Sequence, residues 1–173
     1  MKKAALLTFT LSAISSVASA QLLSYDNEQQ LMGAAAFSPT STYQILQKLI
    51  AKCGSYSPAL SNAGGETLQQ WEQRHHAYLD ENTKIRMQLE KMYTHPDAKK
   101  AYHDMVEKTM PEAVQKQYEA FASPIDLTPK QPLKEQMCQS YIRAIGEKKF
   151  DLKNNDPEVA AYLDKRIHSA TAK

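Results

Sequence analysis

The chain has 173 residues and a formal net charge of +2, from 21 Lys and Arg against 19 Asp and Glu. Two of the basic residues lie within the first three positions, and without them 19 basic residues balance the 19 acidic ones. A nucleic-acid surface needs a basic excess, so this balance excludes that class of partner. Gly is scarce, at 5 residues, while Ala, Gln, Glu, Lys and Leu are abundant, which is typical of helices.

The first twenty residues have the three parts of a secretory signal peptide. Lys2 and Lys3 form a positive start, residues 4–17 carry no charge, and residues 18–20 (Ala-Ser-Ala) form a small-x-small cleavage site. We therefore expect residues 21–173 to form the mature chain, as a single helical domain in the periplasm. No later stretch is a predominantly apolar run of the roughly 18 residues that a membrane span needs.

Two helices are predicted in the first part of the mature chain. Residues 24–37 start with cap-forming side chains and continue as good helix formers, although Gly33 weakens the pattern. Residues 38–40 (Ser-Pro-Thr) then break the chain, and a second helix is predicted over about 41–53, with Gly54 as its stop. Its apolar face consists of Leu46, Leu49, Ile50 and Cys53.

A long central helix is predicted over about 66–93. The segment 55–65, which contains Pro58 and a Gly-Gly pair, is expected to be a connection, and Pro96 disfavours helix at His95. The apolar or partly apolar positions repeat at steps of three and four residues, as in a helix that packs along its whole length. These positions are Leu68, Trp71, His75, Tyr78, Asn82, Ile85, Leu89 and Met92.

The next helix is predicted over about 97–121, followed by a loop. Pro111 lies inside this helix, removes one backbone N–H and clashes with the preceding turn, so we expect a kink at 109–110. Residues 123–132 contain three prolines and are predicted to be the clearest loop of the chain.

Two further helices complete the pattern. The first is predicted over 133–149, and the second is expected to start at Pro157, after cap-forming residues 154–156. No alternating strand pattern occurs. The sequence therefore predicts an all-α bundle of five or six helices around the long helix 66–93.

Cys53 and Cys138 each lie on the apolar face of a predicted helix. In an oxidising compartment such a pair is expected to form one disulfide, which would close a loop of about 85 residues and destabilise the unfolded chain by roughly 4–5 kcal/mol. The alternative is a thiol or metal pair, which usually shows a Cys-x-x-Cys spacing that is absent here.

A candidate polar binding site lies on the long helix, at Trp71, Arg74, His75, Tyr78 and Asn82. His75, Tyr78 and Asn82 follow one another on a single face, where they could recognise a partner group or respond to pH. The alternative is structural: these side chains satisfy one another and the backbone, and Asn82 determines how the helix pairs with its neighbours.

A second group is a weaker candidate for a metal site. Met92, His95, His103 and Met105 cluster around Pro96, and soft Met and His ligands suit Cu. Methionine at helical spacing is more often core filling, and the two histidines lie on either side of a break without a defined ligand spacing. No cofactor is predicted.

No catalytic motif is found. The chain has no Gly-x-Ser-x-Gly, no His-Glu-x-x-His and no Gly-rich phosphate loop, and its acidic residues are spaced as on a solvated helix face. We therefore predict that the protein is not an enzyme.

The chain resembles a group of small exported helical proteins of Gram-negative bacteria. The resemblance consists of Cys53, residues 71–74 (Trp-Glu-Gln-Arg), residues 78–79 (Tyr-Leu) and Cys138, and covers about 53–79 plus the second cysteine. Members usually carry Trp-x-x-Arg-Asn, and His75 takes the place of that Asn. The resemblance implies a fold and a compartment but no activity.

These observations together predict a protein that binds rather than catalyses. The favoured function is a periplasmic interaction protein, such as an envelope accessory, a chaperone or the immunity partner of an exported toxin. Its partner would be another envelope or exported protein. The alternative is a small-ligand or metal (Cu/Zn) carrier that uses the His and Met residues around Pro96.

Overall fold

The computed structural model describes residues 24–171, with side chains up to Ser169. The expected signal peptide, residues 1–20, lies outside the described residues. Within them every regular element is helical, which confirms the all-α prediction. In chain order the elements are α1 (Glu28–Ala35), α2 (Ser38–Gly54), α3 (Pro58–Met92), α4 (Pro96–Asp104), the π-helical η1 (Met105–Thr109), α5 (Met110–Leu127), α6 (Gln131–Gly146), α7 (Leu152–Asn155) and α8 (Pro157–Thr171).

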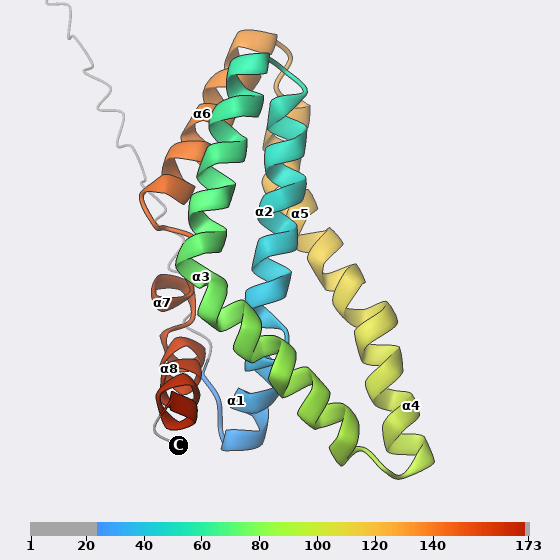
Figure 1. Ribbon diagram of the computed structural model, residues 1–173. Helices are drawn as coiled ribbons and strands as arrows, with labels where there is room; N and C mark the ends of the chain where they lie inside the picture. The colour runs from blue at the N-terminus through green and yellow to red at the C-terminus, as the bar shows by residue number, and fades with distance from the viewer. Residues whose placement is uncertain (1–23, 172–173) are drawn as a thin grey trace, which may run out of the picture.

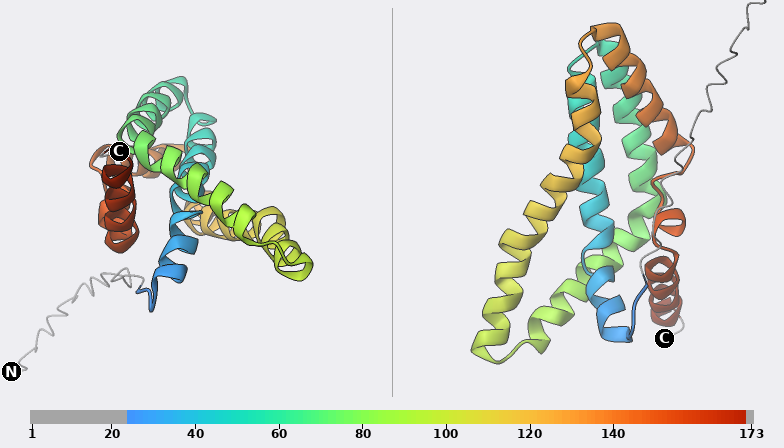
Figure 2. Two further views of the ribbon diagram at one scale, coloured as in Figure 1. Left: turned by 60° about the horizontal axis from the view of Figure 1, so that its bottom comes forward. Right: turned by 180° about the vertical axis from the view of Figure 1, so that it is seen from behind.

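The molecule has two parts that share the long helix α3 (Figure 1). In one part, α2, α5 and α6 run beside the N-terminal half of α3, and α2 packs against both α3 and α5. In the other, the C-terminal half of α3 and α4 diverge from the bundle and meet at a corner, while α1, α7 and α8 pack beside the middle of α3 (Figures 1 and 2). If α4, η1 and α5 count as one interrupted helix and the single turn α7 is set aside, the described chain has six helices.

The long central helix is confirmed, but it starts eight residues earlier than predicted. The expected connection at 55–65 is wrong, because α3 begins at Pro58 and its first turn is capped by Ser57, whose Oγ accepts the Leu60 N–H at 3.3 Å. Gly64 lies in the helix where α2 comes closest: a Cβ there would be 2.8 Å from Ile50 Cγ2. The glycine that suggested a break therefore permits a close contact between two helices.

Pro39 also led to a wrong prediction at the start of α2. Residues 38–40 were expected to break the chain, but they form the first turn of the helix, and Pro39 is buried. The first turn of a helix needs no N–H from its residues, so proline is compatible with it.

The kink predicted at 109–110 is present as a π-helical segment just before it. In η1 the helix widens over Met105–Thr109, and the Met110 N–H donates to Met105 O, five residues back. Pro111 then lies in the first turn of α5. The wider turn relieves the clash that Pro111 would create in a regular helix.

The loop predicted at 123–132 is present but much shorter than predicted. Helix α5 continues through Pro124 to Leu127, and only residues 128–130 separate it from α6. Ala122 and Ile125 are buried on either side of Pro124, and the Thr128 hydroxyl donates to Pro124 O at 2.9 Å. Burial of the helix face therefore outweighs the one hydrogen bond that the proline removes.

The predicted disulfide is confirmed. Cys53 at the end of α2 and Cys138 in α6 are bonded, with their Cα atoms 5.4 Å apart and both side chains fully buried. They pack in a cluster with Leu49, Leu60 and Ile125. The bridge therefore joins α2 to α6 inside the apolar core.

The start of the last helix agrees with its sequence signals. Asp156 precedes Pro157 and its Oδ1 accepts the Val159 N–H at 3.2 Å, as an N-cap does. Its Oδ2 accepts the Tyr25 hydroxyl at 2.5 Å, so the cap also holds the segment before α1. None of the described helices is long and apolar enough to cross a membrane.

Candidate functional site

Three of the five predicted polar site residues line one pocket of about 490 Å³. Arg74, His75 and Tyr78 contribute the α3 wall, and the opposite wall comes from the segment after α6 and from α8. We call this the His75 pocket; it is lined by Arg74, His75, Ala77, Tyr78, Lys148, Asp151, Lys153, Asn154, Asp164 and Ile167. Trp71 and Asn82 are fully buried on the same face of α3, outside the pocket lining.

Both ring nitrogens of His75 have partners within the fold. Nε2 lies 3.1 Å from the Leu152 N–H, which can only donate, so Nε2 is the acceptor. Nδ1 therefore carries the proton and donates to Trp71 O at 2.8 Å. The ring stacks on the Trp71 indole at a centroid distance of 4.0 Å and an interplanar angle of 10°. The neutral imidazole thus joins α3 to the first residue of α7.

Burial is the main influence on the ionisation of His75, whose side chain is 3% exposed. Desolvation lowers the pKa of His75 below its ordinary value of 6.5; the bond to Trp71 and the negative Asp151 oppose this shift, and the positive Arg74 adds to it. If Nε2 were protonated as well, its N–H would point at the Leu152 N–H, and two donors would face each other without an acceptor. The geometry therefore selects the neutral form.

Asn82 connects three helices. Its Nδ2 donates to Ala35 O at the end of α1 at 2.8 Å, and its Oδ1 accepts the Thr40 hydroxyl of α2 at 2.7 Å. Among the described residues, no buried side-chain nitrogen or oxygen lacks a hydrogen-bond partner. The arrangement at His75 and Asn82 accordingly matches the structural alternative, in which the polar groups of α3 hold its neighbours in place.

The rim of the His75 pocket is built from ion pairs. Arg74 binds Asp151 through two nitrogens, at 3.1 and 3.0 Å, and also donates to Ile145 O at 3.2 Å. Tyr78 donates to Asp164 at 2.8 Å, and burial together with that carboxylate raises the pKa of the Tyr78 hydroxyl. These contacts hold the segment after α6, and helix α8, against α3.

The acidic partners on this face were not predicted from the sequence. Glu81 is 3% exposed, and its carboxylate accepts from Arg166 of α8 at 2.8 Å and from Lys84 at 3.2 Å. Asp151 and Asp164 were also unmarked, although each pairs with a predicted site residue. In the sequence, Glu81, Asp151 and Asp164 look like ordinary surface charges. Arg166, Arg74 and Tyr78, which they bind, lie 77 or more residues away in the chain, where no local pattern can indicate them.

The candidate metal residues lie in different settings. The Met92 side chain is 58% exposed, whereas Met105 packs partly buried against the core. His95 lies 3.9 Å from Asp97 and His103 lies 3.8 Å from Glu107, so each histidine faces its own carboxylate. Within residues 24–169 no three His, Cys, Asp or Glu side chains are grouped as metal ligands. The metal-carrier alternative stays a prediction.

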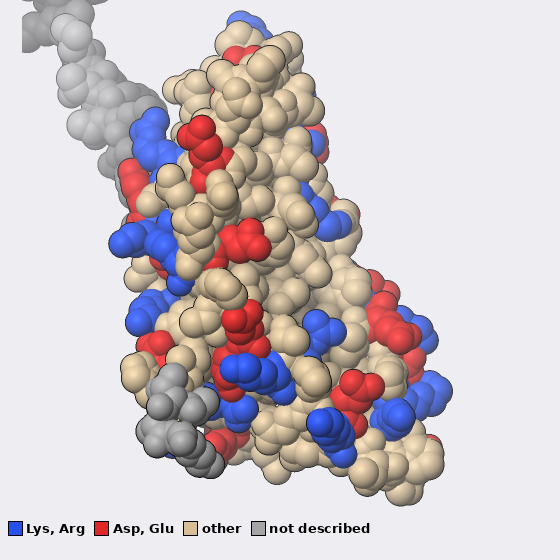
Figure 3. Space-filling model, in the orientation of Figure 1, with Lys and Arg blue, Asp and Glu red and all other residues tan. Residues whose placement is uncertain are grey.

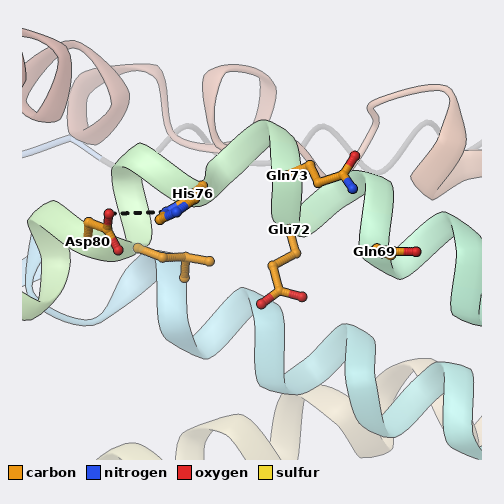
Figure 4. Close-up of a pocket in the computed structure, with 6 residues that line it drawn as sticks. Gln69, Glu72, Gln73, His76 and Asp80 are labelled. Atoms are coloured by element: carbon orange, nitrogen blue, oxygen red, sulfur yellow. Dashed lines mark ion pairs between the residues drawn. The ribbon is translucent and has the colours of Figure 1, made fainter.

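A second pocket, of about 340 Å³, lies on the outer side of α3 and is lined by Gln69, Glu72, Gln73, His76, Leu79 and Asp80 (Figure 4). His76 and Asp80 form an exposed ion pair at 3.1 Å within this one helix. Glu72 points toward α2, where it accepts a long hydrogen bond of 3.5 Å from the Tyr43 hydroxyl. All of the lining comes from a single helix and its one ion pair is exposed, so we assign no chemistry to it.

No family model, curated protein or solved structure matches the chain.

Proposed function

We propose that the mature chain is a non-enzymatic protein-binding module of the bacterial periplasm, of the envelope-accessory, chaperone or toxin-immunity type. We further propose that the partner protein contacts the corner where α3 ends and α4 begins. The proposal is supported by the distribution of exposed apolar side chains.

Large apolar side chains are exposed at the two ends of the molecule. Of the five among the described residues, three lie in one short stretch: Met87 is 54% exposed, Met92 58% and Tyr93 38%. Leu127 and Leu133 lie at the opposite end, on either side of the α5–α6 turn. We call Met87, Met92 and Tyr93 the corner patch, although Met87 and Met92, five residues apart in α3, point to different sides of the corner. It belongs to the part of the molecule that diverges from the bundle (Figures 1 and 2).

The corner patch has the composition of a protein contact surface. Methionine is flexible and adapts to different partner shapes, and Tyr93 offers a rigid ring supported by Tyr102, with ring centroids 5.3 Å apart. Acidic and basic side chains are mixed over this lower part of the molecule, whereas the upper part of the same face is mostly uncharged (Figure 3). An apolar centre with a mixed charged rim is typical of protein interfaces.

Two further observations support the compartment. The first twenty residues have the pattern of a secretory signal, and the disulfide is of a kind that persists in oxidising compartments. Both agree with an envelope protein as the partner.

The test is photo-crosslinking in the periplasm, with a photoreactive residue at the exposed Lys91, next to Met92, and, as control, at the exposed Gln70 in the other half of α3. We expect a discrete adduct with one envelope protein from Lys91 and none from Gln70. The double variant Met87→Asp/Met92→Asp should abolish the adduct, and Leu127→Asp/Leu133→Asp should retain it. An adduct that survives the first pair, or equal adducts from both positions, would refute the proposed surface. Melting curves of all variants establish that each is folded.

A further inference from the structure

An open apolar groove lies between α5, α6 and α7. Its volume is about 570 Å³, and its lining residues are Phe121, Met137, Ser140, Tyr141, Ala144, Lys149, Phe150 and Asn155. Helices α5 and α6 diverge below their shared turn, and the chain after α6 turns back toward them (Figure 2). This volume is within the range of about 300–1,000 Å³ that small-molecule sites occupy.

Aromatic rings form the apolar surface of the groove. Phe121 meets Tyr141 edge to face at 6.0 Å and Phe150 at 5.6 Å, and all three side chains are half-buried. The Tyr141 hydroxyl donates to Phe121 O at 3.1 Å, so its polar atom is satisfied inside the fold. The exposed remainder is ring and hydrocarbon surface, which suits an apolar chain.

The polar lining side chains direct their donors to the backbone. The Ser140 hydroxyl donates to Gln136 O at 3.1 Å, and Asn155 Nδ2 donates to Lys149 O at 3.0 Å. With the second Asn155 bond, from Nδ2 to Asp151 O at 3.4 Å, these bonds occupy the side-chain donors of both residues, so neither is left as a donor for a ligand.

Lys149 is the single charged residue of the lining. Its side chain is 67% exposed, and its ion pair with Glu147 at 2.8 Å is exposed as well, since Glu147 is 48% exposed. An exposed pair of this kind contributes little and can be replaced. Lys149 therefore offers one positive charge at the edge of an apolar groove.

We propose that this groove binds an amphiphile with one hydrocarbon chain and one anionic head group, such as a long-chain fatty acid. The chain lies against Phe121, Tyr141 and Phe150, and Lys149 contacts the head group. A protein partner fits less well, because a specific protein interface uses about 20–30 residues a side and this lining has eight. The site is separate from the corner patch and does not depend on the function proposed above.

The experiment uses the disulfide-bonded mature protein and dodecanoate as the probe. Binding is measured by displacement of a fluorescent fatty acid below the micelle concentration, alongside dodecanol, dodecyl phosphate and phosphatidylglycerol vesicles. We expect dodecanoate and dodecyl phosphate to bind more tightly than dodecanol. Binding to the monomers but not to the vesicles assigns the site to free amphiphiles, and binding only to vesicles would overturn that assignment.

Two variants separate the chain from the head group. Ala144→Trp fills the groove and should abolish binding of all monomers, whereas Ala120→Trp, on the exposed side of α5, should not. Lys149→Glu should weaken dodecanoate binding roughly three- to tenfold and leave dodecanol unchanged, while Lys116→Glu changes neither. Unchanged binding in Ala144→Trp, or no displacement by the wild type, overturns the proposal. Self-association that is lost in Ala144→Trp would assign the groove to a second copy and overturn it as well.

Discussion

The two halves of α3 are stabilised in different ways. The N-terminal half is enclosed by α2 and α6, with Trp71 fully buried, and the disulfide joins these two neighbours. The C-terminal half buries Ile85 and Leu89, but Met87 on its opposite side is exposed, and so is Met92, which follows Leu89 on the same side at the end of the helix. One helix thus supplies both a buried interior and an open surface.

The two halves should differ most in the free energy of unfolding that is lost when an aromatic side chain is truncated to alanine. Trp71→Ala removes a fully buried indole, its stack on His75 and the bond from Nε1 to Phe150 O at 3.0 Å. We expect a loss of about 3–5 kcal/mol in the free energy of unfolding, measured by denaturant titration. Tyr93→Ala, at the corner, is the control and should lose less than about 1 kcal/mol. Equal losses would remove the distinction between the halves.

Removal of the disulfide should have the next largest effect on the free energy of unfolding, and it should act on the bundle around the N-terminal half of α3. Replacing Cys53 and Cys138 together by Ala removes the constraint on the unfolded chain, with an expected loss of about 2–5 kcal/mol, the upper end being the purely entropic value for this loop. Reducing agent should lower the melting temperature of the wild type and leave the double variant unchanged. Two free thiols, found by mass spectrometry in protein taken from the periplasm, would contradict the bridge.

His75 should make the bundle sensitive to acid. Its pKa is lowered in the folded state, so below pH 6.5 the unfolded chain binds the proton more readily. The free energy of unfolding should therefore fall by up to about 1.4 kcal/mol per pH unit as the pH drops from 6.5 to the folded-state pKa of His75. Below that pKa, His75 should cause no further loss. His75→Leu should abolish this pH dependence. It should also lower the free energy of unfolding by about 1–3 kcal/mol, because the Leu152 N–H loses its acceptor. The exposed neighbour provides the control: His76→Gln should keep the slope, and a slope that persists in His75→Leu would assign it elsewhere.

A smaller effect is expected where the chain leaves α6. Lys148 has φ of 65°, the left-handed conformation that side chains with a Cβ adopt at a cost. Lys148→Gly should raise the free energy of unfolding by about 0.5–1 kcal/mol in denaturant titrations, because relief of this strain exceeds the added freedom of the unfolded chain. Gly65→Ala provides a comparison. Gly65 lies inside α3 with open space around its Cβ position, so a gain in stability there would come from helix propensity.

The smallest effect is expected from metal ions at the corner. A melting curve with stoichiometric Cu²⁺ or Zn²⁺ should match the curve without metal, because His95 and His103 each face a separate carboxylate. A large upward shift that disappears in His95→Ala/His103→Ala would instead support the metal-carrier alternative.

Local patterns in the sequence were enough for several features of the structure. The three- and four-residue spacing from Trp71 to Leu89 predicted a packed helix and correctly buried His75 and Asn82, because helical periodicity is a property of neighbouring residues. The disulfide followed from the number of cysteines and their places on apolar faces. Pro111 likewise predicted a local break.

The tertiary structure decided what those elements contact. Glycine at position 64 and proline at position 124 are weak helix residues by themselves, and both lie inside helices because burial against neighbouring helices outweighs their local preference. The partners of His75 and Glu81, namely Leu152 and Arg166, are 77 and 85 residues away. No periodic pattern reaches that far, since such contacts form only when distant helices pack together. The sequence by itself therefore determined which side of each helix is buried, and only packing determined the partner of each buried polar group.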